Sequence, residues 1–144
     1  MSLFSAISIG ASGMAAQRAR AEVLVENLAN AETTRTPEGG PYRRKDVVFA
    51  SATTVSPFSS VFNAHLESAG GVTVSDLVTD TSDPEHRYLP GHPDADADGY
   101  VAFPRINPAE DMVDLMGAAR SYQANVSAIA AVKDMIQHSL DLLR

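Results

Sequence analysis

Residues 107–144, NPAEDMVDLMGAARSYQANVSAIAAVKDMIQHSLDLLR, form the stretch of sequence that decides the fold. Apolar residues recur there at alternating spacings of three and four, which places them on one face of a helix. Asn107 is a favourable N-cap, Pro108 suits the first helical position, and Glu110 occupies the acidic position of a capping box. At ~1.5 Å per residue the helix would be roughly 55 Å long. We expect its apolar face to be covered partly by a helix at the N-terminal end of the chain and partly by neighbouring molecules.

The packing residues predicted on this helix follow the same spacing, which only Lys133 interrupts. They are Met112, Leu115, Tyr122, Val126, Ile129, Ile136 and Leu140.

The N-terminal flank shows a matching 4-3 rhythm, which ends in a run of helix breakers at residues 33–41. The packing residues predicted on it are Ile7, Met14, Ala21, Leu24 and Leu28. Gly10, Gly13 and the alanines make this helix narrow. An isolated helix of this kind is marginal, since most helical stability in proteins comes from packing.

Five polar residues interrupt the two helical patterns, namely Asn27, Asn30, Ser121, Gln123 and Asn125. One interpretation is surface polarity, with Asn30 close to a helix C-cap. The other is that these side chains form hydrogen bonds between the helices and fix their register, as a buried asparagine does in coiled coils. The pattern favours neither interpretation.

The centre of the chain has short β-type runs at residues 47–49, 72–74, 86–89 and 100–103, separated by Gly and Pro turns. The stretch 51–69 is rich in Ser and Thr and is expected to be a flexible loop. We predict an α+β fold, in which long N- and C-terminal helices pair as a coiled-coil-like stalk and carry a small antiparallel β-rich domain. The predicted segments are 1–34, 35–106 and 107–144.

Composition excludes several classes of function. The chain of 144 residues has no cysteine, which rules out disulfides, thiol catalysis and cysteine-ligated metals. Its net charge of −7 disfavours binding to nucleic acid, and residues 37–106 hold ten acidic and five basic residues. No catalytic or cofactor-binding motif is present, so no enzyme activity and no cofactor is predicted. The first seventeen residues have no basic n-region, and we expect neither a cleaved signal peptide nor membrane insertion.

One local motif supports a different class of function. Residues 94–99, DADADG, match the first six positions of an EF-hand calcium loop, but Arg105 stands where the twelfth position needs a glutamate. A calcium- or metal-binding module centred on residues 92–98 is therefore an alternative, and a hairpin turn ending in Asp-Gly is the simpler interpretation. A cytoplasmic coiled-coil adaptor is a further alternative.

Two runs near the N-terminus, residues 12–18 (SGMAAQR) and 27–33 (NLANAET), resemble the signature of the flagellar axial proteins of the rod and hook. Stretches at 90–96, 99–101, 112–113, 120–126 and 133–135 make the chain most similar to a proximal-rod member of that family. Two segments depart from the family pattern. The stretch 51–69 is longer than usual, and residues 104–108 differ from the usual lead into the last helix.

This resemblance implies a structural subunit of the bacterial flagellar basal body. The subunit would leave the cytoplasm through the flagellar type III export apparatus without cleavage and assemble in the periplasm. Copies of it and other rod subunits would form the helical drive shaft that transmits torque. The resemblance places the terminal helices inside that assembly and the β-rich centre outside.

Overall fold

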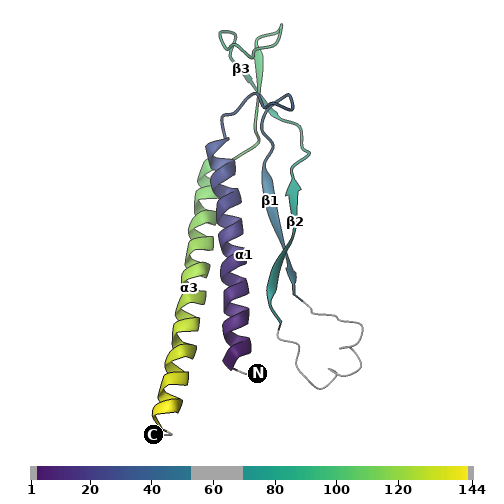
Figure 1. The fold of residues 1–144 in the computed structure, drawn as a ribbon. Helices are drawn as coiled ribbons and strands as arrows, with labels where there is room; N and C mark the ends of the chain where they lie inside the picture. Colours follow the sequence, from purple (N-terminus) through teal and green to yellow (C-terminus); the bar gives the residue numbers. More distant parts are fainter. Residues whose placement is uncertain (1–2, 53–69, 143–144) are drawn as a thin grey trace, which may run out of the picture.

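The computed structural model describes residues 3–52 and 70–142. Within these ranges the chain forms α1 (Leu3–Ala29), β1 (Lys45–Ser51), β2 (Val72–Thr79), β3 (Glu85–Tyr88), β4 (Tyr100–Phe103) and α3 (Pro108–Asp141). The two helices run antiparallel, side by side, with both chain ends at the same end of the molecule (Figure 1). The predicted α+β fold with paired terminal helices is confirmed.

The molecule has three layers along most of its length. α1 packs against α3 on one side and against both β1 and β2 on the other (Figure 1). Among the described elements, α3 packs only against α1. The central helix therefore has two covered sides and the outer helix has one.

The strands form two separate antiparallel pairs, where the sequence suggested one small sheet. β1 pairs with β2, and β3 pairs with β4. The four β-type runs of the sequence fall within or overlap these strands, although β2 extends to Thr79. The β1–β2 ribbon lies along α1, whereas the shorter hairpin lies beyond the helix ends (Figure 1). Most of the segment predicted as a loop at 51–69 lies outside the described residues.

The helix ends follow local sequence rules. The Asn107 side chain accepts a hydrogen bond from the Ala109 amide at 3.2 Å, and Pro108 opens α3, so the predicted N-cap is confirmed. At the end of α1, the Asn30 side chain donates to the Glu26 carbonyl and accepts from the Thr33 hydroxyl. Asn30 thus serves the helix terminus, as the first of the two interpretations expected. No helix in the described ranges is long and apolar enough to cross a membrane.

The buried core is small and is divided between the helix pair and the short hairpin. Its apolar members are Ala16, Leu24, Val101, Phe103 and Ala118. Two polar side chains, Asn27 and Asp111, are also completely buried. A core of this size leaves much of the apolar surface of the chain uncovered.

Candidate assembly interface

Glycine brings the two helices close together. A Cβ atom added to Gly10 would lie 3.0 Å from Ile129 Cγ1, and one added to Gly13 would lie 3.1 Å from Asn125 Nδ2. Both distances are shorter than ordinary contact, so α3 side chains occupy the space that a larger α1 residue would need. Glycine weakens a helix, and its presence here is explained by the close approach of the two helices.

The residues of α3 that face α1, which we call the seam, differ at every second position from the predicted series of packing residues, the predicted stripe. The less exposed residues of α3 are Asp111, Asp114, Leu115, Ala118, Asn125, Ile129, Val132 and Ile136. Leu115, Ile129 and Ile136 belong to the predicted stripe, but Met112 and Val126 are exposed, and Asp111 and Asn125 take their places. Val132 likewise replaces Lys133, so the seam has no charged interruption there.

The difference has a physical reason. The predicted stripe took Val126, the apolar residue of its pair, whereas Gly13 leaves room on α1 for the side chain of Asn125. Tyr122 is 41 % exposed and Leu140 is 61 % exposed, so neither is enclosed by the helix pair. On α1 the predicted residues are more covered: Leu24 is buried, and Ile7, Met14, Ala21 and Leu28 are half-buried.

α3 carries an unusual amount of exposed apolar surface. Its exposed large side chains are Met112, Val113, Met116, Tyr122, Val126, Met135 and Leu140, and the C-cap residue Leu142 is exposed as well. Isolated exposed apolar residues are normal, but this many along one helix indicate an interaction surface.

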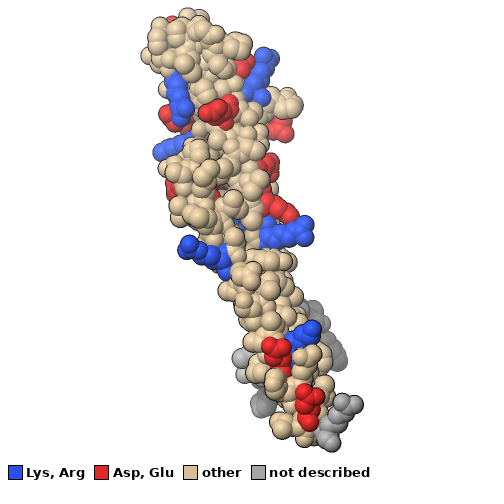
Figure 2. All heavy atoms as spheres, turned by 90° about the vertical axis from the view of Figure 1, so that its left-hand side faces the viewer, with Lys and Arg blue, Asp and Glu red and all other residues tan. Residues whose placement is uncertain are grey.

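The half of the helix pair nearest the chain ends has a long stretch without charge. Residues 3–17 of α1 and 121–132 of α3 contain no Asp, Glu, Lys, Arg or His. Figure 2 shows the matching band of uncharged surface on the α3 side, between the charged upper part and the charges near the end of α3. Such a surface loses little hydration free energy when another protein covers it.

Asn27 joins α1 to the start of the ribbon. Its Nδ2 donates to the Lys45 carbonyl at 2.8 Å, and its Oδ1 accepts from the Lys45 amide and the Tyr42 hydroxyl, both at 3.0 Å. The hypothesis of a hydrogen bond between the helices is therefore wrong for Asn27, whose partners belong to the loop and β1. Asn125 Nδ2 donates to the Ser121 carbonyl of its own helix, and Ser121 and Gln123 are exposed.

The hydroxyl of Tyr42 is expected to make stability depend on pH in alkaline solution. Burial, and secondarily Glu26, raises the pKa of Tyr42 from 10.0 to about 12. Because the folded pKa is the higher one, this stabilising contribution is complete below pH 10 and is lost as the pH rises toward 12. Tyr42→Phe should flatten this dependence and cost about 1 kcal/mol at neutral pH. Urea unfolding at pH 8 and pH 11 measures both effects.

Tyr100→Phe is the control, because the Tyr100 ring is 44 % exposed. It should leave the alkaline loss of stability as it is in the unmodified chain. Equal pH slopes for the two variants would contradict the role assigned to Tyr42.

Near the junction of α1 and the ribbon there is an ion pair that was not predicted from the sequence. Arg44 Nη2 lies 3.0 Å from Asp111 Oδ1, and the Asp111 side chain is 1 % exposed. Neither carboxylate oxygen has a well-aligned hydrogen bond in the described part of the chain, so the contact is mainly electrostatic. Burial raises the pKa of Asp111, the Arg44 charge opposes this rise, and the carboxylates of Asp46, Asp114 and Glu110 add to it.

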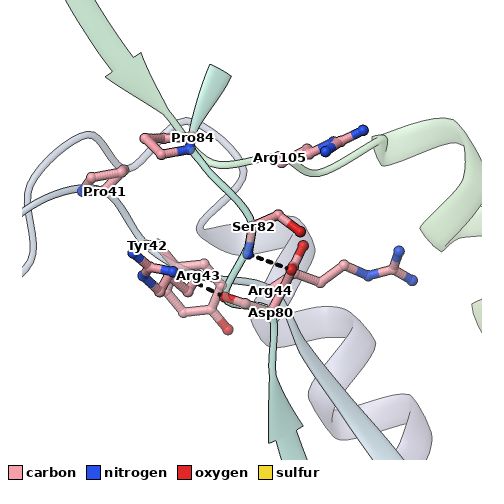
Figure 3. Close-up of a pocket in the computed structure, with 8 residues that line it drawn as sticks. All are labelled: Pro41, Tyr42, Arg43, Arg44, Asp80, Ser82, Pro84 and Arg105. Atoms are coloured by element: carbon pink, nitrogen blue, oxygen red, sulfur yellow. Dashed lines mark hydrogen bonds between the residues drawn. The ribbon is translucent and has the colours of Figure 1, made fainter. Parts of the chain in front are cut away.

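The junction contains a small cavity between the ribbon and the short hairpin. Figure 3 shows the residues around it: Pro41, Tyr42, Arg43, Arg44, Asp80, Ser82, Pro84 and Arg105. The Ser82 amide donates to Asp80 Oδ1. Hydrogen bonding with Ser82, first through its side chain and then through its amide, holds the pKa of Asp80 below its usual value. The cavity measures about 20 Å³, which is room for roughly one water molecule and too little for an organic ligand.

The acidic loop uses its carboxylates for internal contacts. Asp94 accepts a hydrogen bond from the Thr34 hydroxyl at 2.8 Å, and Arg35 lies 3.8 Å away. Asp96 Oδ1 accepts from the amides of Asp98 and Tyr100. No group of three potential metal ligands is present in residues 3–52 and 70–142. The loop is thus a hydrogen-bonded hairpin turn, and the calcium-binding alternative lacks support.

Comparisons with known proteins agree with these observations. The family model described as flagellar basal body rod FlgEFG protein C-terminal matches residues 97–142, which include all of α3. Flagellar basal-body rod protein FlgC of Bacillus subtilis is 41 % identical, and the alignment covers 99 % of both chains. The proteins of the same name from Borreliella burgdorferi and Salmonella typhimurium are 38 % and 39 % identical, again over nearly the whole of each chain.

A long helix pair with many exposed apolar side chains on one helix is typical of a structural subunit. The chain belongs to the FlgC family of flagellar basal-body rod proteins. It is a structural component of the flagellar basal body and assembles with other rod subunits; it is not an enzyme. The metal-binding and cytoplasmic-adaptor alternatives are not supported.

Proposed function

We propose that this subunit polymerises through its terminal helices into the helical drive shaft of the proximal rod. Residues 1–34 and 107–144 would form the inner domain, and residues 35–106 would face outward. The observation that carries the proposal is the charge-free half of the helix pair, together with the exposed apolar residues of α3. In this arrangement Met112, Tyr122, Val126 and Leu140 contact neighbouring subunits.

Close packing explains how such a shaft transmits torque. Alanine and serine side chains on the charge-free half let helices of adjacent subunits approach closely, with little side-chain freedom to lose. Contacts repeated from subunit to subunit without closing a ring generate a helical assembly. A densely packed wall resists twisting because its interior has low compressibility.

The proposal extends to the location and route of the subunit. Membership of this family supports a periplasmic position in the rod and delivery by the flagellar type III export apparatus without cleavage. The partners proposed are therefore the export apparatus, other rod subunits and copies of this chain.

A charge placed in the charge-free surface tests the assembly proposal. Ala128 is exposed on α3, so Ala128→Glu should change the stability of the isolated subunit by less than about 0.5 kcal/mol. In the assembly the carboxylate would be buried without a partner, and we expect loss of incorporation into basal bodies and loss of swimming. Both are measured in cells that carry the variant as the only copy.

The same substitution at an outer position serves as the control. Ala97 is exposed in the turn of the short hairpin, next to carboxylates that already face solvent. Ala97→Glu should leave incorporation and swimming unchanged. If Ala128→Glu also assembled normally, the helix surface would not be the assembly interface.

A further inference from the structure

The three-layer arrangement leaves two open faces on opposite sides of the molecule. One is the side of α3 that points away from α1, and the other is the side of the β1–β2 ribbon that points away from α1. The inference below rests on the proposed polymerisation and specifies one contact within it.

The open face of α3 includes a compact cluster of Val113, Met116 and Arg120, which we call the α3 patch. These residues follow i, i+3, i+7 spacing and lie on the helix side opposite the seam residues Leu115 and Ala118. Val113 is 62 % and Met116 is 53 % exposed. Arg120 is exposed, and no ion pair engages it within residues 3–52 and 70–142. The patch is therefore apolar with one free positive charge.

The open face of the ribbon includes Val48, Asp76 and Val78, which we call the ribbon patch. Along β1, Lys45, Val47 and Phe49 are half-buried and Val48 is exposed, so Val48 points to the side of the ribbon away from α1. Asp76 is the cross-strand partner of Val48, and Val78 lies two residues further on the same face. Val48 and Val78 are 42 % and 47 % exposed. This patch is apolar with one negative charge.

The two patches lie at the same level of the molecule. Arg20 of α1 borders a groove with Val47 and Phe49 on the ribbon side. On the other side Arg20 Nη2 lies 3.3 Å from Asp114 Oδ2, within the first turns of α3. A second copy placed beside the first, without a large axial shift, would set one patch against the other.

We propose that the α3 patch of one subunit docks on the ribbon patch of a second copy of this chain, with Arg120 facing Asp76. Opposite charges at the edge of an apolar contact fix the partner and its orientation. The contact joins two different surfaces, so a bound pair still exposes one free α3 patch at one end and one free ribbon patch at the other. Such a contact propagates from copy to copy. It also covers β2, in which every residue is exposed in the single chain.

Disulfide cross-linking tests the contact directly, because the chain has no cysteine of its own. A chain carrying both Val78→Cys and Met116→Cys should give a ladder of cross-linked copies when isolated basal bodies are oxidised. Each single variant should remain monomeric. Dimers from Met116→Cys alone would indicate a symmetric contact and overturn the proposal. Ala97→Cys combined with Met116→Cys is the control and should not cross-link.

Charge exchange provides a second, independent measurement. Asp76→Arg and Arg120→Asp should each lower incorporation into basal bodies at least fivefold, and the double variant should recover most of the loss. Asp83→Arg, on an exposed loop, should have no effect. Thermal unfolding of each isolated variant shows whether its fold is intact. Losses that simply add in the double variant would contradict the pairing.

The outcomes separate this contact from the broader proposal. Loss of assembly in Ala128→Glu, with no ladder and no recovery on charge exchange, would overturn the docking contact and leave helix-mediated polymerisation in place. Cross-links only to other rod proteins would show that the occupant is not a second copy, which also overturns the inference. Normal assembly of Ala128→Glu would contradict the broader proposal itself.

Discussion

Replacing Asn27 with leucine is expected to lower the free energy of unfolding by about 3 kcal/mol or more. The Asn27 side chain is 0 % exposed and makes three hydrogen bonds, to the amide and carbonyl of Lys45 and to the hydroxyl of Tyr42. Leucine has a similar volume but satisfies none of these groups, and unpaired polar groups in a buried site each cost roughly 1–3 kcal/mol. Urea unfolding of the isolated subunit, followed by circular dichroism, measures the loss.

The same substitution three residues later is the matched control. Asn30 is half-buried, and its hydrogen bonds stay within the last turn of α1 and the following loop. Asn30→Leu should therefore cost about 1 kcal/mol or less. If Asn27→Leu were no more destabilising than Asn30→Leu, the junction of α1 and β1 would not depend on this side chain.

Replacing Gly10 with leucine is expected to destabilise the subunit by about 2 kcal/mol, although leucine is the better helix former. The space around Gly10 is filled by Ile129, whose Cγ1 atom is 3.0 Å from the position of an added Cβ. The larger side chain must push the helices apart, which also changes the surface that neighbouring subunits meet. Incorporation into basal bodies should fall together with the unfolding free energy.

Gly117 offers the opposite case on the other helix. Nothing lies within 4 Å of a Cβ added there, and the position is exposed. Gly117→Leu should therefore increase the stability of the isolated subunit by about 0.5–1 kcal/mol, through helix propensity alone. Equal effects of the two substitutions would mean that helix propensity, and not close packing, governs both sites.

The long-range architecture was predictable because the sequence repeats it many times. The 3-4 spacing recurs over most of both helices, and the N-cap at Asn107 fixes where the second one begins. The register of the pair was harder to predict. Periodicity alone does not distinguish Met112 from Asp111, or Val126 from Asn125, when the smaller or more polar residue of each pair faces α1.

Contacts between distant segments were not predictable from the pattern. Arg44 precedes β1 and Asp111 lies in the first turns of α3, and neither position has a sequence signal that connects it with the other. The partner of Asn27 was not predictable for the same reason. A buried asparagine in a heptad pattern suggests another helix, but the chain folds a strand against that side of α1. The seam positions 111, 118, 125 and 132 hold Asp, Ala, Asn and Val, and this mixture gives no signal that separates them from positions 112, 119, 126 and 133.

The layer order has a consequence for how the subunit opens. α1 and the ribbon are close in sequence and hold each other through Asn27 and through the Ser12 hydroxyl, which accepts a hydrogen bond from the Val72 amide. α3 comes last in the chain and, among the described elements, packs only against α1. Detaching α3 therefore requires less free energy than extracting α1, which would disrupt every layer. The terminal helix is thus the part of the subunit that is able to leave and re-pack against a neighbour while the rest keeps its shape.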